Sequence, residues 1–197
     1  NGVNFVIRTS PTKTEAIAGY VTSSGSLQIL CFNGSTWTNE WTATVGGTGT
    51  TKRFDIAYET NTGDALVLYS TDATTNELDY RTKSGTLDCG SANWVDQPAF
   101  DSPGTSAAVY WVKMAWDKRS TSNLIAAIWA DGANDLQGAV WSGTAWTQRG
   151  APFETSLEVV GASTTPNVDD FDVEFESTSG DILVAWANSV GTEGTNG

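Results

Sequence analysis

Residues 54–81 read FDIAYETNTGDALVLYSTDATTNELDYR, and this stretch decides the fold. Its first six residues alternate, with large apolar side chains facing one way and charged or small ones the other, which is the period of a β-strand with one apolar side. A tight turn follows, because Gly63 tolerates a positive φ. The apolar run 65–69 and the alternating residues 78–81 then complete an antiparallel meander of three strands.

The same meander recurs along the chain. Its first strands begin at residues 3, 54, 112 and 171, so the spacings are 51, 58 and 59 residues. A repeat of this length, built from several short strands, is typical of propeller blades. The predicted repeats are 1–48, 49–104, 105–165 and 166–197, and the pattern predicts that the last one lacks its third and fourth strands. In each copy the second strand is an aliphatic run closed by an aromatic residue: Tyr20, Tyr69, Trp129 and Trp186.

We therefore predict a single all-β domain, a β-propeller-like array of about 3.5 four-stranded antiparallel blades. The alternative is a β-sandwich, which would bury the same alternating strands. Because propellers close with about 4–8 blades, either a longer parent chain or self-association with a second copy is expected to complete the last blade. The chain begins in a repeat strand with no visible signal peptide, as expected of a mature product or an excised piece.

Composition excludes several classes of partner. The formal net charge is −13, with 23 acidic and 10 basic residues, so we expect neither nucleic acid nor an anionic membrane surface as a partner. No apolar run approaches the length of a membrane helix, which predicts no membrane insertion. The chain has no His, which removes the commonest general base and metal ligand. Cys31 and Cys89 form either one disulfide between neighbouring repeats or two separate buried thiols.

Two features resemble a known family. The strands FDIAYE, VKMAWD and FDVEFE, together with Gly-x-x-Trp turns at 34–37 and 143–146, resemble the blade repeats of bacterial extracellular β-propellers, the group that includes sialidase-like and lectin propellers. Sialidase-type blades carry an Asp-box, Ser-x-Asp-x-Gly-x-x-Trp, at this turn. Phe32 and Trp141 stand at the Asp position here, so the box is not met. The resemblance thus implies the architecture and not sialidase chemistry.

Acidic residues of the first strands are candidate ligand-binding groups: Asp55, Glu59, Asp117 and Asp172. If the first strands are innermost, these carboxylates line a channel and form a cation site or an acid/base pair. The competing interpretation is a solvated polar face. Acid-rich turns at 131–135 and 169–172 offer oxygen ligands for calcium, but neither has the spacing of a calcium loop, and turn formation explains them as well. We predict no cofactor and no metal, with calcium as a weak alternative.

Tryptophan supplies the second set of candidates. Trp41 and Trp111 lie outside the repeating positions, and we predict that they are exposed and stack on a ligand such as a sugar ring. Tryptophans at core positions of the repeat are assigned to packing: Trp116, Trp129 and Trp186. Those at one recurring turn are interpreted as structural latches: Trp37, Trp94 and Trp146.

These observations favour a non-catalytic extracellular or cell-surface module, such as an adhesin repeat, that binds glycan or protein through the loops of a repeat scaffold. No catalytic residue is predicted. One alternative is a structural subunit of a surface filament or layer. Another is a fragment of a glycoside hydrolase-type enzyme that uses Asp and Glu.

Overall fold

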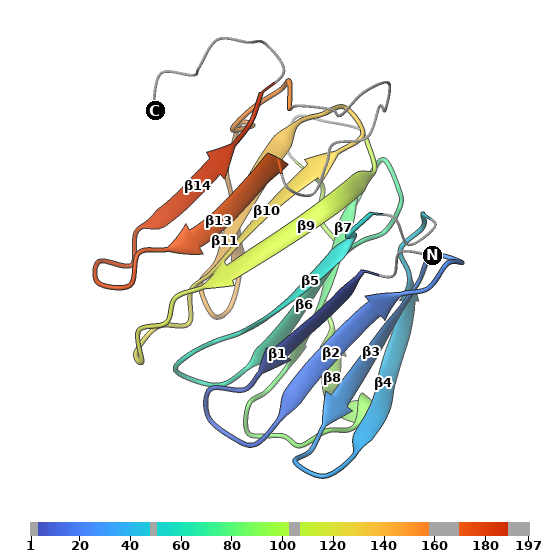
Figure 1. The fold of residues 1–197 in the computed structure, drawn as a ribbon, viewed down its shortest axis with the longest axis vertical. Helices are drawn as coiled ribbons and strands as arrows, with labels where there is room; N and C mark the ends of the chain where they lie inside the picture. Colours follow the sequence, from blue (N-terminus) through green and yellow to red (C-terminus); the bar gives the residue numbers. More distant parts are fainter. Residues whose placement is uncertain (1–3, 48–50, 103–106, 158–169, 189–197) are drawn as a thin grey trace.

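The computed structural model describes residues 4–47, 51–102, 107–157 and 170–188. These residues form four antiparallel sheets that stand side by side in chain order (Figure 1). In the described ranges, helical structure is limited to 3-10 turns, of which η1 spans Ser91–Asn93. The predicted all-β, propeller-like array of blades is thereby confirmed, and the β-sandwich alternative is wrong because each sheet packs on the next rather than in one facing pair.

Each of the first three sheets is a four-stranded meander. The first comprises β1 (Phe5–Thr9), β2 (Ala16–Val21), β3 (Ser26–Phe32) and β4 (Trp37–Thr44). The second comprises β5 (Phe54–Tyr58), β6 (Ala65–Ser70), β7 (Leu78–Lys83) and β8 (Trp94–Asp96). The third comprises β9 (Val109–Trp116), β10 (Ile125–Asp131), β11 (Leu136–Trp141) and β12 (Trp146–Gln148).

In the described residues, the fourth sheet has two strands, β13 (Phe171–Phe175) and β14 (Ile182–Trp186). The first strands of successive sheets contact one another: β1 lies beside β5, β5 beside β9, and β9 beside β13 (Figure 1). The later strands of each sheet therefore extend away from this row.

The four sheets repeat one another in register. The aromatic residue that closes each second strand pairs with the same position of its first strand, as Phe5 with Tyr20 and Phe54 with Tyr69. The third and fourth sheets follow with the pairs Val112–Trp129 and Phe171–Trp186. Equivalent positions in the sequence thus occupy equivalent positions in space, as the repeat predicts.

Apolar side chains fill the three interfaces between successive sheets. Between the first two sheets, Ile17, Ile29, Phe54 and Ile56 belong to one buried cluster. A second cluster joins the second and third sheets, and a third joins the third and fourth sheets. Because both faces of an inner sheet are covered, β5 and β6 are buried along their whole length.

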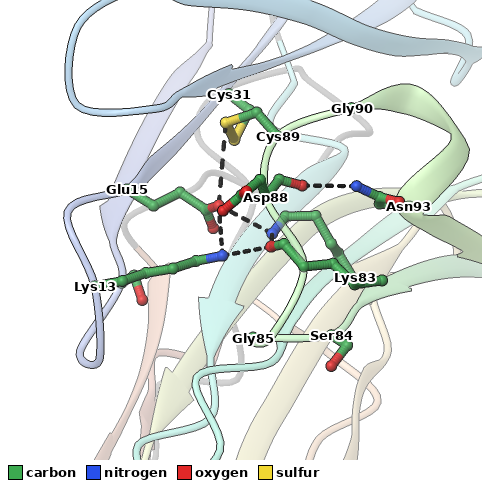
Figure 2. Close-up of polar contacts among 12 residues, drawn as sticks. Lys13, Glu15, Cys31, Lys83, Ser84, Gly85, Asp88, Cys89, Gly90 and Asn93 are labelled. Carbon is green, nitrogen blue, oxygen red and sulfur yellow. Dashed lines mark hydrogen bonds and ion pairs between the residues drawn. A yellow bond between two sulfur atoms is a disulfide. The ribbon is translucent and has the colours of Figure 1, made fainter.

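A disulfide between Cys31 and Cys89 ties the first sheet to the connector between β7 and β8, with Cα atoms 5.6 Å apart. Figure 2 shows the polar network beside it, in which buried Glu15 accepts a hydrogen bond from Nζ of fully buried Lys83 at 3.0 Å. The Tyr58 hydroxyl also donates to Glu15, at 3.0 Å. A carboxylate oxygen of Glu15 and the two sulfur atoms lie within 4.8 Å of one another, close enough to surround a metal ion. The two sulfur atoms form a disulfide, however, and are not the thiolates that a metal ion needs.

Among the residues that the structure describes, no helix has the length and apolar character needed to cross a membrane.

Candidate functional site

Trp41 is buried, and the prediction that it is exposed is wrong. Its side chain is 7% exposed and packs against Tyr69 and Trp94 at ring-centroid distances of 5.7 and 5.6 Å. The cause is a β-bulge in the pairing of β3 with β4, which turns both Glu40 and Trp41 towards the interior. A strict period of two in the sequence does not reveal such a bulge.

Trp111 is also buried, again against the prediction. It is 7% exposed and belongs to the cluster between the third and fourth sheets. The predicted strand began at residue 112, whereas β9 begins at Val109. Trp111 is therefore a strand residue covered by the next sheet, rather than part of a connector.

Asp55 is a buried structural carboxylate. Its Oδ2 accepts hydrogen bonds from Lys52 Nζ at 2.6 Å and from the backbone N–H of Met114 at 2.9 Å. Arg8 Nη2 approaches Oδ1 at 3.4 Å. Asp55 thus links the inner strands of three successive sheets, and Arg8 and Lys52 compensate its charge.

Glu59 and Asp117 lie where the first strands of the second and third sheets enter their hairpin turns. Glu59 accepts a hydrogen bond from the Thr62 hydroxyl within its own turn. Asp117 accepts from both the backbone N–H and the guanidinium Nε of Arg119, each at 3.0 Å. Both residues shape turns, and Asp117 does so in the manner of an Asx turn.

Asp172 is exposed on β13, with its side chain 79% accessible and Lys113 Nζ 3.6 Å away. A glycosidase needs two carboxyl groups about 5–9.5 Å apart. Asp55 and Glu59 are four residues apart on one extended strand, which separates their Cα atoms by about 13 Å. Hydrogen bonds to Asp55, Glu59 and Asp117 hold strands and turns in place, so these carboxylates serve to stabilise the fold.

The acid-rich turn at 131–135 also shapes the backbone. Asp131 Oδ1 accepts hydrogen bonds from the N–H groups of Ala133 at 2.9 Å and Asp135 at 3.1 Å. This is turn chemistry of the Asx kind, the interpretation that competed with calcium. The other acid-rich turn includes residue 169, which lies outside the described residues.

One relationship recurs at all three interfaces between sheets. A carboxylate of the preceding unit accepts a hydrogen bond from the indole Nε1 of a tryptophan in the next sheet. The pairs are Glu40–Trp94 at 3.1 Å, Glu59–Trp141 at 2.6 Å and Glu154–Trp186 at 3.2 Å. The first two pairs are buried, whereas Trp186 is 40% exposed.

The exposed pair adjoins a cleft. A pocket of about 270 Å³ lies between the third sheet and β14, lined by Ile128, Gly138, Thr147, Arg149, Phe153 and Val184. In the described residues the fourth sheet has two strands, so the outer part of the third sheet is less covered here than the sheets before it. This cleft is the candidate functional site.

The polar side of the cleft is formed by the segment after β12. The guanidinium of Arg149 lies over the Phe153 ring, with Cζ 4.2 Å from the ring centroid, and its Nε donates to the Ala151 carbonyl at 3.1 Å. Phe153 in turn packs against Trp186, at a centroid distance of 6.0 Å. Gly138 makes room for this arrangement, because a Cβ there would lie 2.8 Å from Phe153 Cε2.

Glu154 is held in its charged form. Burial alone would raise its pKa, but hydrogen bonds from the N–H groups of Thr155 and Ser156, from Trp186 and from Asn188 outweigh burial and lower the pKa. Phe153 and Arg149 thus line the cleft, and the half-exposed indole of Trp186 and the carboxylate of Glu154 lie beside Phe153. Such a set suits a polyhydroxylated ligand, whose apolar ring face stacks on the aromatic group while its hydroxyls exchange hydrogen bonds with charged groups.

The sequence did not identify this site. Trp186 is assigned to core packing from the sequence, whereas it is 40% exposed in the structure. Trp129 is buried as predicted, whereas Trp37, interpreted as a latch, is 44% exposed. Arg149 and Glu154 lie in a connector without a recurring pattern, so no sequence signal marks them.

The fold is shared with solved structures of other proteins. An arginine-to-alanine triple mutant of AofleA from Arthrobotrys oligospora aligns with a TM-score of 0.60 at 14% identity, covering 96% of this chain and 52% of that protein. The fucose-binding lectin of Aleuria aurantia, a six-bladed β-propeller, aligns with a TM-score of 0.54 at 13% identity, covering 94% of this chain and 54% of the lectin. The same lectin in complex with Fucα1-6GlcNAc aligns with a TM-score of 0.52 at 11% identity.

The chain therefore has a β-propeller fold and spans about half the length of the solved structures it matches. These structures support the β-propeller part of the predicted resemblance and not the bacterial sialidase-like group. No protein-family model matches the sequence, and no curated protein is significantly similar to it.

Proposed function

We propose that this protein is a non-catalytic carbohydrate-binding module that takes its ligand in the cleft between the third sheet and β14. The observation that carries the proposal is the exposed Trp186, fixed by Glu154 and adjoining Phe153 and Arg149, on a scaffold that glycan-binding lectins share. The indole and Phe153 offer apolar area to a sugar ring. Arg149 offers several N–H donors to its hydroxyls.

We also propose that the module acts outside the cell or at its surface. The Cys31–Cys89 disulfide supports this location, because such bonds persist in oxidising compartments. The strongly acidic composition suits a soluble surface-exposed domain and disfavours nucleic acid.

A glycan array tests the proposal. The wild-type chain should bind a defined set of glycans, and Trp186→Ala and Arg149→Ala should each weaken the binding about fivefold or more, because stacking and charge-assisted hydrogen bonds are each worth about 1 kcal/mol or more. Trp37→Ala is the matched control: its indole is 44% exposed but lies on the first sheet, so its binding should equal that of wild type. Absence of glycan binding, or unchanged binding by Trp186→Ala with a native circular dichroism spectrum, would contradict the proposal.

A further inference from the structure

Asp131 is a buried carboxylate of which one oxygen lacks a hydrogen-bond partner. It is the last residue of β10 and is fully buried, and its Oδ1 accepts the backbone N–H groups of Ala133 and Asp135. Its other oxygen, Oδ2, is equally enclosed and accepts no hydrogen bond from the described residues. The Asx turn therefore uses only one of the two oxygens that share the charge of this group.

Asp131 differs in this respect from the other buried carboxylates of the described ranges. Those are Glu15, Glu40, Asp55, Glu59, Glu77 and Asp117. None of them has an enclosed oxygen without a hydrogen-bond partner, and three of them lie in ion pairs with Lys or Arg. None of the ion pairs found in the described part of the chain includes Asp131. Burying an uncompensated charge is costly, and buried charges are ordinarily paired or bound to a metal ion.

A second oxygen of this kind belongs to the same turn. The backbone N–H of Asn134 donates to the carbonyl of Asp131 at 3.2 Å, so the two residues are the first and fourth of a β-turn, whose Cα atoms lie within about 7 Å. Asn134 Oδ1 is enclosed and, like Asp131 Oδ2, accepts no hydrogen bond within the described ranges. One short turn thus contains two enclosed side-chain oxygens that lack a donor.

The surroundings of the turn are negative. Burial raises the pKa of Asp135, the next residue along the chain, and the charges of Asp131 and Glu154 raise it further. The chain as a whole has a formal net charge of −13. A cation bound at the turn would relieve the repulsion among these carboxylates.

From these observations we propose that the turn at 131–135 binds a calcium ion, with Asp131 Oδ2 and Asn134 Oδ1 as ligands. Carboxylate and amide oxygens suit this hard cation, whose shell of about six to eight oxygen atoms is completed by backbone carbonyls and water. Zinc and copper prefer nitrogen and sulfur ligands, which this turn does not offer. The turn lacks the residue spacing of a helix-loop calcium motif, so the sequence pattern alone does not reveal the site.

The ion would also hold the segment after β12, which carries residues of the candidate cleft. The backbone N–H of Leu157 donates to the carbonyl of Asn134 at 3.0 Å, and Leu136, directly after the turn, pairs with Phe153 and Glu154 through backbone hydrogen bonds of 2.7 and 2.8 Å. Because the ion binds the folded turn and not the unfolded chain, calcium should stabilise the folded protein.

Calcium titration of the chelator-treated chain tests the proposal. Isothermal titration calorimetry of the wild-type chain should show one saturable calcium site, and the midpoint of thermal unfolding should rise with calcium concentration. Magnesium at the same concentrations should raise the midpoint much less, because it requires stricter geometry and gives up its water reluctantly. Asp131→Asn keeps the oxygen that accepts the turn hydrogen bonds but removes the charge, so the calcium-dependent rise should disappear.

Asn134→Gly is a second variant, which keeps the proposal testable if Asp131→Asn does not fold. Glycine tolerates the φ of 68° at this position, and loss of the amide oxygen should weaken calcium binding about tenfold or more. Asp96→Asn is the matched control. Asp96 lies on the second sheet, its side chain is 64% exposed and it pairs with Arg81, so this variant should bind calcium as wild type does.

Three results would overturn the proposal. A wild-type chain that neither binds calcium nor gains stability from it would leave a buried water as the partner of Asp131 Oδ2. Wild-type affinity in both turn variants would show an adventitious ion only, held by surface carboxylates. An equal response to magnesium would show a general effect of divalent charge. No measurement here depends on glycan binding, so this proposal and the proposed function fail separately.

Discussion

The indole Nε1 of Trp141 donates a hydrogen bond to Glu59 Oε1 at 2.6 Å across the interface between the second and third sheets. Glu59 directly follows the inner strand β5 of one sheet, and Trp141 ends the third strand of the next. The carboxylate was a candidate ligand group in the sequence. The structure places it instead at one of three similar junctions that join successive sheets.

Removing the acceptor should destabilise this junction. Glu59→Ala leaves the buried indole N–H without a partner and should lower the free energy of unfolding by about 1–3 kcal/mol. Glu59→Gln keeps a carbonyl oxygen, and burial raises the pKa of Glu59, so replacing the carboxylate by a neutral amide should cost less than the alanine change. Urea denaturation of both variants measures the difference. Equal losses in the two variants would show that the hydrogen bond does not contribute.

The array of sheets was predictable because its signals are local. The alternation around Phe54, the turn at Gly63 with φ of 73°, and the aromatic closing each second strand all depend on neighbouring residues. The burial of Trp41 was not predictable, since the pairing of β3 with β4 shifts by one residue at a bulge, and alternation in the sequence does not reveal where a bulge falls. The candidate cleft could not be predicted from the sequence for a similar reason. Arg149 and Trp186 come together through the stacking of two sheets, which sequence spacing does not specify.

The disulfide should contribute a large share of stability. Cys31 and Cys89 are 58 residues apart, and closing a loop of this size restricts the unfolded chain, which gives a stabilisation of about 2–4 kcal/mol. The double variant Cys31→Ser/Cys89→Ser should therefore unfold at a lower urea concentration than the oxidised wild type. Under reducing conditions the two proteins should unfold at the same urea concentration. If the variant still unfolds at a lower urea concentration than wild type in reductant, then packing of the serines, rather than loss of the disulfide, lowers the stability.

The ion pair of Asp117 predicts a pH dependence. Hydrogen bonds from Arg119 outweigh burial and lower the pKa of Asp117 to about 2, from an ordinary value of 3.8. Because the pKa is lower in the folded state, the stabilisation is complete above about pH 4 and is lost as the pH falls through 2. Asp117→Asn should cost about 1 kcal/mol at pH 7, since Arg119 is partly exposed to water.

Urea denaturation at several pH values checks this prediction. The difference between wild type and Asp117→Asn should shrink steadily between pH 4 and pH 2. A difference that is the same at both ends of this range would show that Asp117 acts through its shape in the turn and not through its charge.

Close packing between the first two sheets depends on a glycine in a strand. A Cβ at Gly19 would lie 2.5 Å from Phe54 Cε2 and 2.9 Å from Ile29 Cδ1, both in the interface cluster. Gly19→Ala should therefore overpack the interface and lower the free energy of unfolding by about 1–3 kcal/mol. Gly150→Ala is the matched control, because a Cβ there meets no atom within 4 Å. The midpoint of thermal unfolding should be clearly lower for Gly19→Ala than for Gly150→Ala. Equal midpoints would show that the two sheets can move apart at little cost in free energy.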